Sequence, residues 1–289
     1  MPTVDALPLP LWAWAALAWS ALLGLIACFQ GCLLFGRTWR IRRAPPGRAA
    51  ERRVARAVSL ARPDGVVLNG WLTVDTQQAP QRLLLWFGGR NEHVAWTPDL
   101  AGWLPDDLAL VAFNYRGLGG NRGSPSEAAC VADAEAIARW ACTHFGVDTS
   151  RLHLAGRSLG SGIAMQLAAR LPGGPAAVVL LTPPGSIRAL LRASPLLWPL
   201  TALLRSPLDS LAAARRLRCP VLMLLAEHDR RVPHAHSLAL ADALRRAGAA
   251  VDVHTLPGTS HRSLARTPAA MAQVGRVLSR PGLAEGFLR

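Results

Sequence analysis

Three polar side chains of types used in nucleophilic catalysis each come shortly after an apolar run. Ser158 is the centre of residues 156–160, Gly-Arg-Ser-Leu-Gly, which follow the apolar residues 152–155 and precede a segment with helical spacing. A strand that turns sharply into a helix exposes the serine Oγ, and glycines on both sides leave room for that turn. The alternative is a serine that only caps the helix. The strand before it and the helix after it favour Ser158 as a nucleophile.

A serine hydroxyl needs a general base, and the base needs an acid to orient it. With a G-x-S-x-G turn these partners follow in the chain order acid, then histidine. Asp229 comes after the apolar residues 221–225, and we predict that it is the acid, with Glu227 as the alternative. His261 follows the apolar residues 251–255 in a glycine-containing loop, and we predict that it is the base. The other histidines lie inside expected strands, before the serine or at the start of a helix.

Acyl transfer also needs backbone N–H groups that hold the developing oxyanion. The N–H of Leu159 opens the helix after the serine, where the helix dipole is positive. The second donor usually comes from the loop after an early strand, here residues 86–91. We predict that Arg90 donates it, with the neighbouring Gly89 as the alternative, although an ordinary glycine turn would have the same sequence.

The apolar runs before these residues are short and continuous, and helical patterns separate the later ones. Such a pattern predicts an α/β fold with a mostly parallel central sheet, flanked by helices on both faces. In such sheets the ligand site lies beyond the carboxyl ends of the strands, where the three side chains are expected. The expected strands are residues 66–74, 82–87, 108–113, 152–155, 177–181, 221–225 and 251–255, with helices at 126–144 and 160–171.

An uncharged apolar segment occupies residues 7–35. About 20 helical residues cross a hydrocarbon core of about 30 Å, so this segment is long enough for an uncleaved transmembrane helix. A lipoprotein signal is an alternative, because residues 25–28 resemble a lipobox that ends at Cys28. A cleaved signal peptide is another. Neither alternative agrees with an N-terminus that carries Asp5 and no basic residue.

Arginines follow the apolar segment closely, and no basic residue precedes it. The positive-inside rule predicts a single-pass protein of a bacterial inner membrane with its domain in the cytoplasm, the arginines meeting anionic lipid headgroups. We expect residues 1–36 to be the anchor, 37–58 a basic juxtamembrane linker, and 59–289 the catalytic domain. The arginines nearest the apolar segment are Arg37, Arg40, Arg42, Arg43 and Arg48.

The formal net charge of the 289 residues is +14, and every basic residue counted is arginine. Such a charge can indicate nucleic-acid binding, but no DNA- or RNA-binding motif accompanies it, so we expect no nucleic-acid partner. The histidines and five cysteines have no metal-ligand spacing, and no glycine-rich phosphate loop is present. We therefore expect neither a metal nor a cofactor.

These segments together resemble the α/β-hydrolase superfamily over roughly residues 60–275. More narrowly, the chain resembles single-pass, N-terminally anchored members, described as serine aminopeptidase-like or hydrolase-domain-containing proteins. The segments that carry the resemblance are residues 114–127, 156–160, 220–233 and 257–261. The family's oxyanion loop usually begins His-Gly, whereas this chain has Gly88-Gly89, which leaves the geometry of that loop open.

The expected activity is that of a serine hydrolase that cleaves an ester, thioester or amide bond through an acyl-enzyme. Residues 183–218 are short and rich in Leu, Trp and Pro, which predicts a small apolar cap. Beside a membrane, such a cap favours small-molecule acyl or lipid-like substrates. The alternative hypothesis is a catalytically inactive, membrane-anchored binding protein on the same fold, because a fold alone does not prove an activity.

Overall fold

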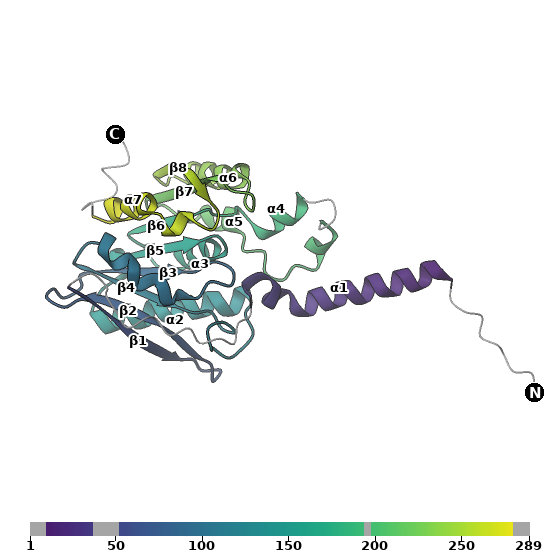
Figure 1. Cartoon of the computed structure of the whole chain (residues 1–289), viewed down its shortest axis with the longest axis horizontal. Coiled ribbons are helices and arrows are strands. Elements are labelled where there is room, and N and C mark those ends of the chain that lie inside the picture. The colour runs from purple at the N-terminus through teal and green to yellow at the C-terminus, as the bar shows by residue number, and fades with distance from the viewer. Residues whose placement is uncertain (1–9, 37–51, 194–197, 280–289) are drawn as a thin grey trace, which may run out of the picture.

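The computed structural model describes residues 10–36, 52–193 and 198–279 (Figure 1). Within these residues, eight strands form a single sheet in the order β1-β2-β4-β3-β5-β6-β7-β8. Their bounds are β1 (Arg53–Ala61), β2 (Val67–Asp75), β3 (Arg82–Phe87), β4 (Leu108–Phe113), β5 (Leu152–Arg157), β6 (Ala177–Leu181), β7 (Val221–His228) and β8 (Val251–Ser260). The pairings β1–β2 and β2–β4 are antiparallel, and the remaining pairings are parallel. The expected α/β fold with a mostly parallel sheet is thus confirmed.

Helices cover both faces of the sheet (Figure 1). The helices are α1 (Leu11–Phe35), α2 (Glu127–Phe145), α3 (Leu159–Ala168), α4 (Ile187–Arg192), α5 (Ser210–Ala214), α6 (His234–Arg246) and α7 (Pro268–Leu278), with the 3-10 segments η1 (Val94–Trp103), η2 (Thr149–Arg151), η3 (Trp198–Ala202) and η4 (Leu264–Arg266). One apolar core lies under α2, α3, α5 and α6, and a second lies under η1 and α7. The central strands are buried on both sides, which explains their continuous apolar sequences.

The sheet begins earlier in the chain than the sequence suggests. β1 pairs with β2 from Arg53, in a segment that we expected to be linker up to residue 58. Its sequence begins Arg-Val-Ala-Arg and continues the arginine-rich segment before it, so it resembles a charged linker. Arg53 is nevertheless buried and donates hydrogen bonds to the carbonyl oxygens of Leu104 and Leu108, both at 3.0 Å. The guanidinium is tolerated because backbone acceptors satisfy it.

The long apolar helix α1 extends away from the rest of the molecule (Figure 1). It is the one helix in the described part of the chain that is long and apolar enough to cross a membrane. Most of its large side chains are exposed, but Gln30 and Phe35 near its carboxyl end are buried against the domain. α1 is therefore joined to the domain by contacts as well as by the chain.

A small cap follows β6. It contains α4 and η3, and residues 194–197 lie outside the described part of the chain. Trp198 and Leu203 are exposed on it, 60% and 38% respectively. The cap contacts α1, because the Gln30 side-chain amide donates to the Leu203 carbonyl at 3.1 Å and its oxygen accepts from the Arg205 N–H at 2.7 Å. The expected cap, residues 183–218, is larger than this, because α5 within that range packs on the domain core through Ala213 and Ala214.

Candidate active site

Ser158 lies at a sharp turn between β5 and α3. Its backbone has φ 51° and ψ −117°, a strained conformation for a residue with a side chain. Glycines make the turn possible, since a Cβ at Gly156 would lie 2.4 Å from the Gly160 carbonyl oxygen. A Cβ at Gly160 would lie 2.1 Å from the Phe87 carbonyl oxygen. The turn therefore presents the Ser158 side chain and brings the start of α3 against the end of β3.

The structure brings Ser158, His261 and Asp229 together from three different strand ends. His261 Nε2 lies 2.9 Å from Ser158 Oγ, and His261 Nδ1 lies 2.8 Å from Asp229 Oδ2. The imidazole and the carboxyl group are both buried, with side-chain exposures of 8% and 3%. Glu227, the alternative acid, instead accepts a hydrogen bond from the Gly258 N–H and is half exposed.

The Asp229 carboxylate is ionised in this setting. Burial opposes its charge, but hydrogen bonds from His261 and from the Val232 and Arg231 N–H groups outweigh burial and lower the pKa of Asp229. An ionised carboxylate can only accept, so Nδ1 of His261 carries the proton. Nε2 of a neutral imidazole is then free to accept the Ser158 hydroxyl proton. The group has the geometry and tautomer that general-base activation of a serine requires.

The predicted oxyanion donors lie on two adjoining segments. Leu159 is the first residue of α3, directly after Ser158. In the loop after β3, the N–H of Gly89 donates to Glu92 Oε2 at 2.8 Å, so it is already engaged. The neighbouring Arg90 is exposed, and its guanidinium Nε donates to the Leu33 carbonyl of α1 at 2.7 Å. The Gly89 N–H thus has a partner inside the loop, and the assignment of the second donor to the Arg90 N–H stays a prediction.

Sequence reasoning missed an ion pair that links the two sides of this site. Arg157 Nη1 lies 2.5 Å from Glu92 Oε2, and its Nη2 donates to the His261 carbonyl at 3.0 Å. Glu92 Oε1 also accepts from Trp96 Nε1 at 3.0 Å. Arg157 therefore connects the loop after β3 to the loop that carries His261. The x position of G-x-S-x-G was the available signal, but a residue type there does not reveal a partner 65 positions away.

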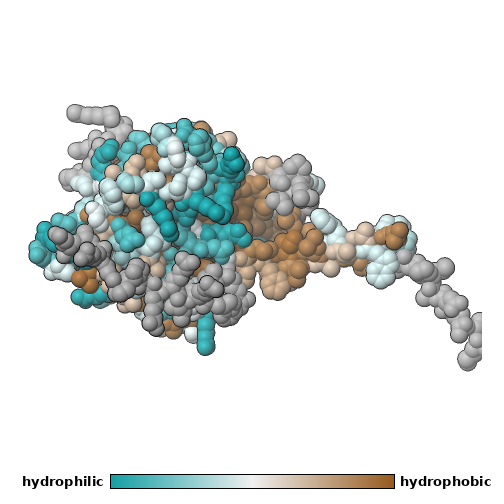
Figure 2. Space-filling model, in the orientation of Figure 1, coloured by the Kyte–Doolittle hydropathy of each residue, from teal (hydrophilic) through white to brown (hydrophobic). Residues whose placement is uncertain are grey.

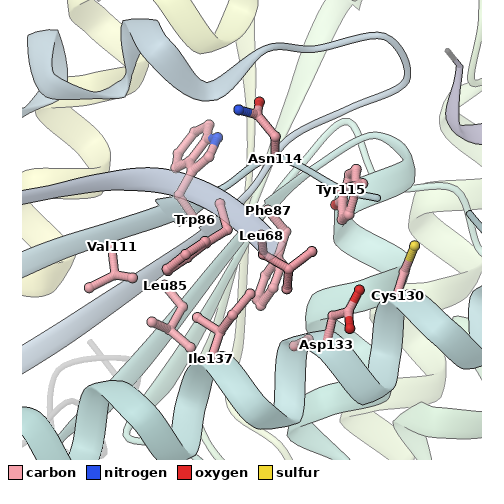
Figure 3. A pocket seen from close by; sticks show the side chains of 12 residues that line it. Leu68, Leu85, Trp86, Phe87, Val111, Asn114, Tyr115, Cys130, Asp133 and Ile137 are labelled. Atoms are coloured by element: carbon pink, nitrogen blue, oxygen red, sulfur yellow. The ribbon is translucent and has the colours of Figure 1, made fainter. Parts of the chain in front are cut away.

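A cavity in the core lies apart from these residues. It sits between the sheet and α2, lined by mostly apolar side chains, and none of Ser158, Asp229 or His261 lines it (Figure 3). Its charged residue, Asp133, is paired with Arg116 at 2.7 Å. Among the described residues, no group of three or more His, Cys, Asp or Glu side chains is placed to hold a metal ion.

The sheet order and the helices on both faces define an α/β-hydrolase. A family model described as the dienelactone hydrolase family matches residues 114–275, more than half of the chain. The chain therefore belongs to the dienelactone hydrolase family.

The chain is also similar to individual proteins over part or most of its length. An uncharacterized protein of Mycobacterium tuberculosis is 35% identical over 172 residues, which are 59% of this chain and 60% of that protein. The lysophosphatidylserine lipase ABHD12 of Danio rerio is 33% identical over 43% of this chain and 36% of its own length. The solved esterase Pf2001 of Pyrococcus furiosus has a TM-score of 0.63 at 15% identity, covering 83% of this chain and 98% of that one. At that identity the likeness concerns the fold.

Proposed function

We propose that Ser158, His261 and Asp229 form the catalytic triad of this hydrolase. The observation that carries the proposal is the pair of hydrogen bonds at the His261 ring, 2.9 Å to Ser158 Oγ and 2.8 Å to Asp229 Oδ2. The three residues follow β5, β7 and β8 in the required chain order of serine, acid and histidine, which supports the same conclusion. Ester, thioester and amide bonds are all within the reach of such a site.

The reaction proceeds in two acyl transfers. His261 Nε2 accepts the Ser158 proton as Oγ attacks the carbonyl carbon, and the oxyanion accepts hydrogen bonds from the Leu159 and Arg90 N–H groups. His261 then gives that proton to the leaving group, and the C–X bond breaks to leave an acyl-enzyme. Water repeats the sequence with His261 as its base, which releases the acid and restores Ser158. Asp229 stabilises the imidazolium in both steps.

The membrane is the proposed setting of this chemistry, with α1 as an uncleaved anchor. In the described helix no charged residue occurs between Leu11 and Phe35. The arginines that follow predict a cytoplasmic domain and contact with anionic lipid, and they lie outside the described residues. A C-terminal reporter active only in the cytosol should be active, and one active only in the periplasm should not. The reverse result would contradict the orientation.

The position that we propose for α1 in the membrane supports an acyl substrate. About 20 residues counted from Leu11 end at Gln30, so Gln30 lies where the hydrocarbon core gives way to headgroups. The cap segment bonded to Gln30, around Leu203 and Arg205, is then at the same level. Figure 2 shows hydrophobic surface where α1 meets the domain. We therefore propose that the cap receives acyl or lipid-like substrates from the membrane, which agrees in kind with the name of the lipase relative.

Fluorophosphonate labelling of the detergent-solubilised protein tests the triad. Labelling is expected for the wild type and for Ser150→Ala, which changes an exposed serine, but not for Ser158→Ala. If a folded wild-type sample is not labelled, or if Ser158→Ala still is, the triad proposal is wrong.

Chain-length preference tests the substrate class. Esters from acetyl to palmitoyl should be cleaved with increasing kcat/KM up to a medium or long chain. Trp198→Ser and Leu203→Ser, on the exposed cap surface, should lower this value for the long chains alone. Activity confined to short water-soluble esters, with no effect of either cap variant, would contradict the lipid-like substrate.

A further inference from the structure

The carboxyl end of α1 is bonded to the loop that follows β3, residues 88–91. The Arg90 guanidinium donates to the Leu33 carbonyl at 2.7 Å, and the Asn91 N–H donates to the Phe35 carbonyl at 3.0 Å. The last carbonyls of a helix have no partner inside the helix. Here residues of the loop satisfy two of them, and the positive guanidinium also faces the negative end of the helix dipole.

A second contact reaches the same loop through an aromatic pair. Phe35 is 1% exposed and packs edge-to-face on Tyr115, with ring centroids 5.5 Å apart. The Tyr115 hydroxyl donates to the Gly88 carbonyl at 2.9 Å. Phe35 thus supports Gly88 through one intervening ring, while Gly89 is held from the other side by Glu92.

Close backbone contact makes this junction specific. Gly36 ends α1 with φ 89°, and a Cβ there would lie 1.7 Å from Asn91 Oδ1. Asn91 itself has φ 56°, the left-handed region that asparagine tolerates better than most residues. A Cβ at Gly31 would lie 1.9 Å from the Pro125 carbonyl oxygen, so the helix is close to the domain one turn earlier as well.

We propose that the last turn of α1, Leu33–Gly36, is a positioning element of the active site: it holds the loop that carries the Arg90 oxyanion donor. Each of residues 88–91 has a hydrogen bond that fixes it, and three of the four lead to α1 directly or through Tyr115. The anchor then contributes to catalysis as well as to location. This inference depends on the proposed hydrolytic function of Ser158.

The test compares two phenylalanines of α1 in the full-length, detergent-solubilised protein with a short, water-soluble ester. Phe35→Ala removes the buried ring, and Phe29→Ala removes one that is 52% exposed on the same helix. Displacement of an oxyanion donor lowers rates by about 10- to 100-fold. We expect a fall of that size in kcat for Phe35→Ala, with KM within about threefold. Phe29→Ala should match the wild type.

Three readouts separate a positioned donor from general damage to the fold. The affinity for a short-chain trifluoromethyl ketone, whose serine adduct carries an oxyanion, should fall by the same factor as kcat/KM. The pH profile of kcat/KM should keep its midpoints, because α1 makes none of the hydrogen bonds of Asp229 or His261. Arg90→Ala, an exposed change that keeps the backbone N–H, should give a smaller fall of the same kind, and Arg90→Lys should restore part of it.

The outcomes distinguish this inference from the function on which it depends. Absence of fluorophosphonate labelling in the wild type would contradict the proposed function. Normal labelling, with kcat of Phe35→Ala and Arg90→Ala both within twofold of wild type, would overturn the role of α1 alone. If Phe35→Ala does not fold, as judged by its thermal transition, the kcat of Arg90→Ala decides whether α1 has this role.

Discussion

The two sides of the candidate site are built in different ways. On one side Asp229 and His261 extend from the ends of β7 and β8, are buried, and hold each other by a hydrogen bond of 2.8 Å. On the other side lies the loop of Arg90, with Gly88 and Gly89 buried and Arg90 and Asn91 exposed, and its predicted contribution is a backbone N–H. It is held by Glu92 from within the domain and by the end of α1 from outside it.

The difference follows from what each side supplies. The triad uses side-chain chemistry, so its residues must be of particular types at particular strand ends. An oxyanion donor is a backbone N–H, which every residue except proline has. What matters there is position, and position is set by whatever packs around the loop. Substitutions on the first side should therefore remove chemistry, whereas substitutions on the second side should misplace an intact group.

The largest effect is expected from Asp229→Asn. The variant's Oδ1 can still accept from the Arg231 and Val232 N–H groups, but its amide would donate toward His261 Nδ1. The imidazole would then carry its proton on Nε2 and could not accept from Ser158. Loss of the correct tautomer lowers kcat by about 10⁴-fold in a serine triad. Steady-state rates on a soluble ester measure the effect.

Glu227→Gln is the matched control, since Glu227 is the carboxylate near the end of β7, two residues before Asp229. Its bond from the Gly258 N–H can be kept by the amide oxygen. Activity within about threefold of wild type is expected. A large loss of activity in Glu227→Gln with a small loss in Asp229→Asn would mean that Glu227, and not Asp229, is the acid of the triad.

A smaller loss is expected where the two sides meet, at Arg157. Arg157→Met removes both the 2.5 Å contact with Glu92 and the hydrogen bond to the His261 carbonyl. Glu92→Gln leaves Arg157 without a charge partner and places an amide beside the donors of Gly89 and Trp96. Because the loop shifts while the triad stays complete, we expect kcat to fall by about 10- to 100-fold in both variants.

Arg170→Met is the control for removing an arginine from an ion pair. Its partner Glu135 lies at 3.5 Å, and both side chains are at least a third exposed. An exposed pair of this kind contributes at most about 1 kcal/mol to stability, so this variant should have wild-type kcat. If Arg157→Met also keeps wild-type kcat, the loop does not depend on this connection.

The same contrast explains what could be predicted from the sequence. Ser158, Asp229 and His261 were identified by residue type, chain order and the apolar runs before them, and the structure brings all three together. The parallel sheet was predicted because buried strands have continuous apolar sequences. β1 was missed because its arginines resemble a linker, although Arg53 is buried through backbone acceptors. The supports of the Arg90 loop were missed too, since the contacts of Glu92 with Arg157 and of Arg90 with Leu33 join distant segments without a local pattern.

The smallest effect on activity, with a clear effect on stability, is expected at His153 on β5, the strand that leads to Ser158. Burial, together with the charge of Arg82, lowers the pKa of His153 to about 4, from an ordinary value of 6.5. The unfolded chain therefore binds a proton between these two values and the folded chain does not. The free energy of unfolding falls as pH falls from about 6.5 to about 4, by about 3 kcal/mol from this residue, and this loss levels off below pH 4.

His153→Gln, which does not titrate, should lack that component. Thermal or denaturant unfolding between pH 7 and pH 4 measures it, and the wild type should lose more stability over this interval than the variant does. At pH 8 the kcat of the variant should equal that of wild type, because His153 makes no contact with the triad hydrogen bonds. Equal pH dependence of unfolding in the two proteins would mean that the pKa of His153 is the same in the folded and the unfolded chain. A loss of kcat at pH 8 would instead mean that the His153 side chain helps β5 to position Ser158. Substitutions on the triad side could then misplace an intact group, as we expect only for the side of the Arg90 loop.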